Sequence, residues 1–223
     1  MQRMFKLFLV PAIFLFFVAS IFAQGSYKVE SAPAPTGSDV PKALLDSLDA
    51  RGARVVSDAG PVCEIWLRKG MALGQAAGGL GDVMYGQLGV GNLIGVLHFP
   101  AQGADFRGQP MKPGFYALRY AQIPQDGAHM GNYPTRDTVL MTPAAADTQI
   151  DQTLSFQDMV KLSKQASGAP HPAFLVMSAV SDGAAFPSVA KDDQGHQNVQ
   201  LKVQGKNGEL PIGITVVGKW EGA

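Results

Sequence analysis

The side chains best suited to chemistry lie in two polar segments, predicted as loops over residues 101–113 and 122–136. The candidate ligand-binding residues in these loops are Asp105, Phe106, Asp126, His129, Tyr133 and Arg136. Carboxylates, an imidazole and a guanidinium are groups that binding and catalytic sites use, and such sites concentrate in loops. The aspartates are equally well explained as turn formers. Spacing alone therefore assigns no reaction and no catalytic residue.

A copper site is the sharpest metal hypothesis that the sequence allows. His129 and Met130 are adjacent, and Met84, Met111 and Met141 are possible further ligands. Imidazole together with soft thioether sulfur selects copper(I). The alternative is that the methionines fill gaps in the core, and the four histidines show no metal-binding spacing. We therefore expect no cofactor and keep copper handling as an alternative.

Aromatic residues provide a third kind of candidate site. Phe106, Phe115, Tyr133 and Trp220 could stack on a pyranose ring. The alternative is burial in the core, where most aromatic side chains of a globular domain lie.

The common catalytic and cofactor motifs are missing from the sequence. Residues 79–84 and 89–94 begin like G-x-G-x-x-G but lack its last glycine, and no P-loop, H-E-x-x-H or G-x-S-x-G is present. The chain has 18 basic and 18 acidic residues. A basic stripe for general nucleic-acid binding is therefore not expected.

The N-terminus has the pattern of a secretory signal over residues 1–23. Arg3 and Lys6 precede an apolar run from Leu7 to Ala23, which predicts cleavage after Ala23 and a secreted or periplasmic protein. The alternative is an uncleaved anchor, but the run is at the lower limit for a span. If the signal is cleaved, no stable membrane anchor remains. Cys63 is the single cysteine, so no internal disulfide is possible, and we expect a buried, inert thiol.

After the signal, composition predicts a linker and then one domain. Residues 24–37 are rich in Pro, Ala and Ser and are expected to be extended or disordered. A short helix begins at Ser38 or Asp39 and ends at Gly52, and the single domain covers 38–223.

Most of the predicted elements in this domain are short strands. The predicted strands are 53–56, 62–68, 83–88, 92–99, 115–121, 138–141, 173–177, 199–203 and 210–217. Asn207-Gly208 predicts the tight turn of the last hairpin. One helix is expected at 155–166, where Ser155 and Asp158 form a capping pattern and Gly168 ends the run. The fold class is therefore mainly β, an antiparallel β-sandwich with one helix on its edge or end.

The segment Lys112–Tyr120 contains Pro113-Gly114-Phe115-Tyr116-Ala117-Leu118. It resembles the Pro-Gly-x-Tyr-x-Leu strand opening of exported bacterial β-sandwich proteins that have no assigned activity. In such modules the glycine turns the chain and the aromatic residue plugs the end of the sandwich. The resemblance covers about one tenth of the chain. It implies a fold and no site.

Together these features favour an exported, non-enzymatic binding or structural module. Its ligand or partner outside the cytoplasm would be a polysaccharide or a protein. The alternatives are a hydrolase-type enzyme with its site in the loops at 100–113 and 122–137, and a periplasmic copper-handling protein that uses His129.

Overall fold

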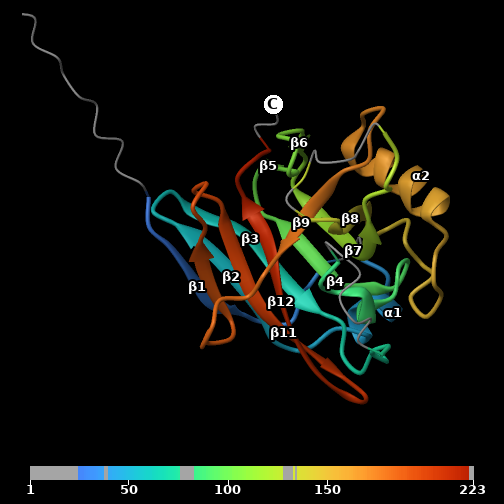
Figure 1. Cartoon of the computed structure of the whole chain (residues 1–223), viewed down its shortest axis with the longest axis horizontal. Helices are drawn as coiled ribbons and strands as arrows, with labels where there is room; N and C mark the ends of the chain where they lie inside the picture. The colour runs from blue at the N-terminus through green and yellow to red at the C-terminus, as the bar shows by residue number, and fades with distance from the viewer. Residues whose placement is uncertain (1–24, 38–39, 76–82, 128–132, 134, 221–223) are drawn as a thin grey trace, which may run out of the picture.

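The computed structural model describes residues 25–37, 40–75, 83–127, 133 and 135–220 (Figure 1). The predicted signal at 1–23 and the capping residues Ser38 and Asp39 lie outside this part of the chain. Of the helices that the structure describes, none has the length and apolar character needed to cross a membrane.

Ten strands form one antiparallel sheet, in the order β1-β2-β3-β4-β7-β8-β9-β12-β11-β10. Their bounds are β1 Tyr27–Ala32, β2 Gly52–Ser57, β3 Gly60–Leu67, β4 Leu93–Phe99, β7 Gly114–Gln122, β8 Asp137–Pro143, β9 Phe174–Ser178, β10 Ser188–Lys191, β11 Gln197–Gly205 and β12 Gly208–Val217. The remaining elements are the hairpin strands β5 Gly103–Ala104 and β6 Pro110–Met111, the helices α1 Lys42–Asp46 and α2 Phe156–Ser167, and the 3-10 turn η1 Gly86–Leu88. The predicted mainly β, antiparallel fold is confirmed.

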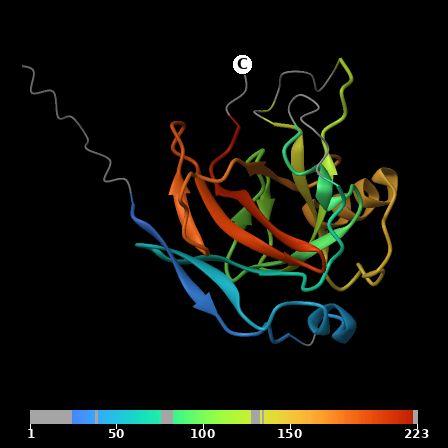
Figure 2. The same ribbon diagram turned by 60° about the horizontal axis from the view of Figure 1, so that its bottom comes forward.

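The sheet curls round until its two edge strands, β1 and β10, approach each other. Figure 2 shows the blue and cyan strands β1 and β2 facing the orange and red strands β10, β11 and β12. The result is one nearly closed sheet with an inside and an outside.

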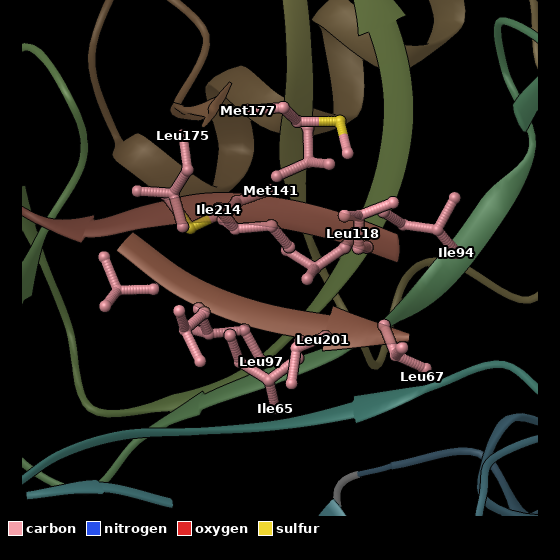
Figure 3. Packing of buried hydrophobic residues seen from close by; sticks show 14 of the residues in the cluster. Ile65, Leu67, Ile94, Leu97, Leu118, Met141, Leu175, Met177, Leu201 and Ile214 are labelled. Carbon is pink, nitrogen blue, oxygen red and sulfur yellow. The ribbon is translucent and has the colours of Figure 1, made fainter. Parts of the chain in front are cut away.

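Alternation along each strand sends every second side chain into one interior core. In β7, Tyr116, Leu118 and Tyr120 point inward, and Phe115, Ala117 and Arg119 lie on the outer side, as period 2 predicts. Figure 3 shows the core side chains of facing strands meeting inside the sheet. Its labelled members are Ile65, Leu67, Ile94, Leu97, Leu118, Met141, Leu175, Met177, Leu201 and Ile214.

The two helices cover the outer face of the sheet. Leu44 of α1 packs with Trp66 and Val96, and Met159 of α2 packs with Leu140 and Val176. The predicted helix 155–166 is thus confirmed as α2. It lies on the outer face of the sheet and not at an edge or end.

Several predicted elements require correction. Residues 27–32, expected to belong to a linker without packing, form β1, which pairs with β2 along its whole length. The folded domain therefore includes residues before 38. The predicted strand 83–88 contains the turn η1. Gly52, predicted to end the first helix, instead begins β2, and the helix ends at Asp46. The last hairpin, with its turn at Asn207-Gly208, is confirmed.

Candidate ligand-binding groove

A groove of about 310 Å³ lies on the outer face of the sheet, alongside α2. Its floor is formed by the outward side chains of β7, β8 and β9, including Ala121, Leu140 and Phe174. One wall is α2 and the turn that follows it. The opposite wall is the start and end of the segment that joins β7 to β8, with Ile123 and Tyr133.

Helix α2 contributes a stripe of side chains to this groove. Phe156, Val160 and Lys164 all line it and are spaced four residues apart, which places them on one helix face. Phe156 is 40% exposed, a large fraction for a phenylalanine. Met159 and Ser163 lie on the neighbouring face and are buried. The helix therefore has one face for packing and an adjacent one for the groove.

Local hydrogen bonds fix α2 and the turn at its end. The Ser155 hydroxyl accepts from the backbone N–H of Asp158 at 3.1 Å, and Gly168 ends the helix in the left-handed conformation, with φ of 63°. Ser163 Oγ donates to the carbonyl of Ala173 at 2.8 Å. Ser167 Oγ donates to the carbonyl of His171 at 2.8 Å. The last two bonds tie the end of the helix to the groove-lining turn and to Ala173, the residue before β9.

Aromatic rings continue the groove towards the C-terminus. Tyr133 stands edge-on to Phe174, with ring centroids 5.4 Å apart and an angle of 86°. Trp220 lies 5.9 Å from Tyr133, and Phe106 lies 6.5 Å from it. Phe106 is buried. Three of the four predicted stacking residues therefore meet, whereas Phe115 stacks on His98 elsewhere on the sheet.

The rim of the groove carries more positive than negative side chains. Arg107 and Lys164 line it and are exposed, as is the imidazole of His171, and Asp126 is the acidic residue among the described lining side chains. Arg107 contributes a guanidinium group and Lys164 an ammonium group. An anionic group in the groove would therefore be favoured electrostatically.

Asp105 positions the loop that carries Arg107. It is buried and its carboxylate accepts from the N–H of Arg107 at 2.9 Å, the N–H of Gln109 at 2.8 Å and the side-chain amide of Gln109 at 2.7 Å. Burial raises the pKa of Asp105 above its ordinary value, against the opposing effect of these hydrogen bonds. Its role is to build a turn, which is one of the two roles that the sequence allows.

The structure brings only some of the other predicted site residues together. Arg136 closes the neck of the segment joining β7 to β8, where its Nε donates to the carbonyl of Ile123 at 2.9 Å. Asp126 and Tyr133 line the groove, and Phe106 lies beneath Tyr133. His129 and Met130 fall outside the described residues. Of the six predicted site residues, Asp126 and Tyr133 therefore line the groove, and Asp105 and Phe106 support it.

The proposed copper ligands can be placed in part. Met111 and Met141 are fully buried in the interior core, whereas Met84 is exposed. Within the described part of the chain, no group of three or more His, Cys, Asp or Glu side chains is arranged to hold a metal ion. The core positions of Met111 and Met141 agree with the alternative that methionines fill gaps.

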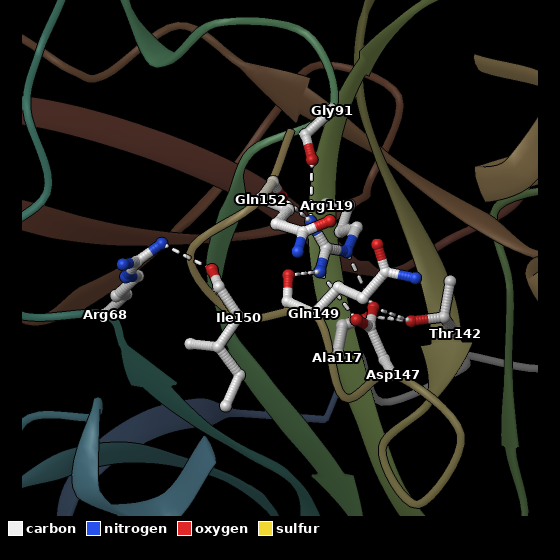
Figure 4. A network of polar contacts seen from close by, with 9 residues as sticks. All are labelled: Arg68, Gly91, Ala117, Arg119, Thr142, Asp147, Gln149, Ile150 and Gln152. Carbon is white, nitrogen blue, oxygen red and sulfur yellow. Dashed lines mark hydrogen bonds and ion pairs between the residues drawn. The ribbon is translucent and has the colours of Figure 1, made fainter. Parts of the chain in front are cut away.

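Two buried polar clusters were not predicted as such. Arg119 and Asp147 form an ion pair with side-chain exposures of 0% and 1%. Arg119 also donates to the carbonyls of Gly91, Gln149 and Gln152 (Figure 4). Because the N–H donors of the guanidinium all bond to acceptors within the protein, Arg119 ties the chain before α2 to the sheet and is not available to a ligand.

Asp137 is the centre of the second cluster, at the start of β8. It accepts from the N–H groups of Met84 and Tyr85 and from the hydroxyls of Tyr120 and Thr135. Burial, and then the hydrogen bond to Asp137, raise the pKa of Tyr120. This carboxylate anchors Met84 and Tyr85, the two residues before η1, to the sheet.

The groove residues that sequence reasoning missed are Arg107, Phe156, Lys164 and His171. The spacing of Phe156, Val160 and Lys164 was the available signal, because a helix stripe that ends in a lysine is not a core face. Arg107 and His171 carry no comparable pattern.

Comparisons with known proteins assign no family, because no family model matches the chain and neither a curated protein nor a solved structure matches it.

Proposed function

We propose that this protein is an exported, non-enzymatic module that binds an acidic polysaccharide in the groove beside α2. The lining of the groove carries the proposal, since Tyr133 and Phe156 lie in the same lining as the cationic Arg107 and Lys164. Aromatic faces stack on the apolar faces of sugar rings, and guanidinium and ammonium groups pair with carboxylates.

The charges of the groove support binding more than glycoside hydrolysis. Hydrolysis of a glycosidic bond uses two carboxyl groups, about 5–9.5 Å apart, on either side of the scissile bond. Among the described residues of the lining, Asp126 is the single carboxylate. Asp105, the next predicted acid, accepts three hydrogen bonds in its own turn. The arrangement therefore favours retention of a glycan over its cleavage.

The test is binding of the purified chain to an array of acidic and neutral polysaccharides, followed by calorimetric titration of the positive ligands. We expect binding to acidic members, and we expect Lys164→Gln to weaken it by about 1 kcal/mol, or roughly fivefold. Lys161→Gln is the matched control, because Lys161 is an exposed lysine of the same helix that does not line the groove. Equal effects of the two substitutions, or no binding to any acidic glycan, would contradict the proposal.

The export part of the proposal rests on the pattern of residues 1–23 and has its own test. Expression in a Gram-negative host followed by N-terminal sequencing of the periplasmic and culture fractions should give a chain that begins at or near Gln24. An intact Met1 on protein that stays in the membrane fraction would favour the uncleaved anchor.

A further inference from the structure

The wall of the curled sheet contains a window of about 640 Å³ between its two edges. On one side lie Val29–Ser31 of β1. On the other side lie Leu201, Lys202 and Gln204 of β11, together with Phe186 and Pro187, which precede β10. We call this opening, together with its lining residues, the window.

The window exists because β10 is shorter than its neighbour. β10 pairs with β11 only from Gln197 to Gln200, although β11 continues to Gly205. Beyond Gln204 the opening is closed again by the chain that follows β3, where Gly70 N–H donates to the carbonyl of Gln204 at 3.0 Å and Met71 bridges to Gly205. The middle of β11 is thus left without a neighbouring strand over about three residues.

The free backbone groups in this stretch belong to Lys202. Lys202 is paired with Pro211 of β12, at a position of β11 where the backbone N–H and carbonyl point away from β12, towards the window. The bond from Gly70 to Gln204, two residues on, confirms this alternation. Among the described residues, no backbone hydrogen bond joins Lys202 to a partner on the window side.

The floor of the window is apolar. Ala53, Ile65 and Leu201 line it and belong to the interior core. The rim is polar and carries both signs of charge, with Asp49 and Arg51 on one side and Lys202 on the other. Nζ of Lys202 is held by Glu209 at 3.0 Å and lies 5.2 Å from the ring centroid of Phe186. The side chain of Lys202 is therefore drawn to the rim.

The geometry points to a second binding site, in which a short extended peptide of a partner protein occupies the window as the missing strand. Its backbone pairs with the N–H and carbonyl of Lys202, and one apolar side chain inserts towards Ala53, Ile65 and Leu201. This is strand addition to a sheet edge, in which main-chain bonds provide affinity and a pocket selects a side chain. An antiparallel strand of three to four residues spans about 10–14 Å, the length of β11 that lacks a partner.

An extended peptide fits the window better than a small apolar molecule for one reason. The exposed donor and acceptor of Lys202 are spaced as in a strand, and a hydrocarbon in this place would leave both unpaired at the edge of an apolar floor. The site is separate from the groove beside α2 and shares none of its lining residues. Failure of either proposal leaves the other unaffected.

The experiment measures fluorescence anisotropy of labelled hexapeptides that alternate Thr with Val, Leu or Phe, titrated with the full-length chain. We expect at least one member to bind. We expect the same peptide, N-methylated at its central residue, to bind about three- to tenfold more weakly, because it cannot donate to the carbonyl of Lys202. Octanoate is the competing probe for a small amphiphile.

The matched variants are Lys202→Pro and Lys202→Ala. Both remove the ammonium group, but only proline removes the N–H on the window side, and no bond to β12 is lost because this N–H points away from β12. Lys202→Pro should therefore bind the peptide about three- to tenfold more weakly than Lys202→Ala. If circular dichroism shows that Lys202→Pro does not fold, the N-methylated peptide decides the question on the unmodified chain.

Three results would overturn the inference. The first is no peptide binding up to roughly 1 mM, which corresponds to about 4 kcal/mol of binding free energy. The second is equal affinity for the parent and N-methylated peptides. The third is saturable binding of octanoate without binding of any peptide, which would make the window a pocket for small amphiphiles.

Discussion

The two polar regions on the outer face of the sheet behave in opposite ways. Around Arg119, every strong donor meets an acceptor from the same chain, and the exposures of Arg119 and Asp147 are 0% and 1%. Around the groove, the charged groups of Arg107 and Lys164 remain exposed beside aromatic rings. The first arrangement holds loops in place, whereas the second leaves binding capacity unused by the fold. Satisfied hydrogen bonds, more than residue type, therefore separate structural from candidate binding residues here.

The largest expected effect on stability is at the buried ion pair of Arg119 and Asp147. Arg119→Met removes the guanidinium and leaves Asp147 buried, with Thr142 as its remaining side-chain donor. The unfolding free energy, measured by urea denaturation, should fall by about 3–5 kcal/mol. Adding Asp147→Leu should recover part of this loss, because no unpaired buried charge then remains.

Arg68→Met is the matched control for this prediction. Arg68 reaches the same segment, where it donates to the carbonyl of Ile150 and pairs with Asp151, but Asp151 is 88% exposed. A loss of about 1 kcal/mol or less is expected for such a pair. Similar losses for Arg68→Met and Arg119→Met would contradict the distinction between the two pairs.

A smaller effect, which depends on pH, is expected at Asp105 under the groove. Burial raises the pKa of its carboxyl in the folded state, so the folded state binds the proton more tightly than the unfolded chain does. Its stabilising contribution is present at low pH and is lost as the pH rises above about 4, the ordinary aspartate pKa, towards the raised folded value. The stability of the unmodified chain should therefore fall relative to Asp105→Asn over this range.

The measurement for Asp105 is urea denaturation of both proteins at several pH values from about 3 to 7. As the pH rises, the unfolding free energy of the unmodified chain should fall relative to that of Asp105→Asn. A constant difference would show that hydrogen bonds from the Arg107 and Gln109 backbone offset the burial, and that Asp105 titrates alike in both states.

Periodicity predicted the regular part of this molecule and missed the features that depend on distant neighbours. The inward face of β7 and the capped helix α2 follow from local patterns at 115–121 and 155–168. β1 was missed because Pro and Ser dominate its surroundings, and its pairing partner lies about 25 residues away. The partner of Arg119 is 28 residues distant, in a segment without repeating structure. The groove and the window arise where such distant segments meet, so spacing could not reveal them.

Burial also decided the fate of single residues that the sequence left open. Cys63 is fully buried, and burial raises the pKa of its thiol to about 12. This agrees with the buried, inert thiol expected from the sequence. Phe106 and Tyr133 were both predicted to bind a ligand, but Phe106 is buried and only Tyr133 lines the groove.

The smallest expected effect belongs to Phe156, in the wall of the groove. It is 40% exposed, so Phe156→Ser should change the unfolding free energy by no more than about 0.5 kcal/mol while removing one aromatic face from the groove. Met159→Ser, one turn on and fully buried, is the comparison and should lose about 2–5 kcal/mol. If both substitutions destabilise the protein equally in urea, Phe156 is a core residue and α2 has no separate groove face. The contrast between the buried Arg119 cluster and the exposed groove then fails at this helix.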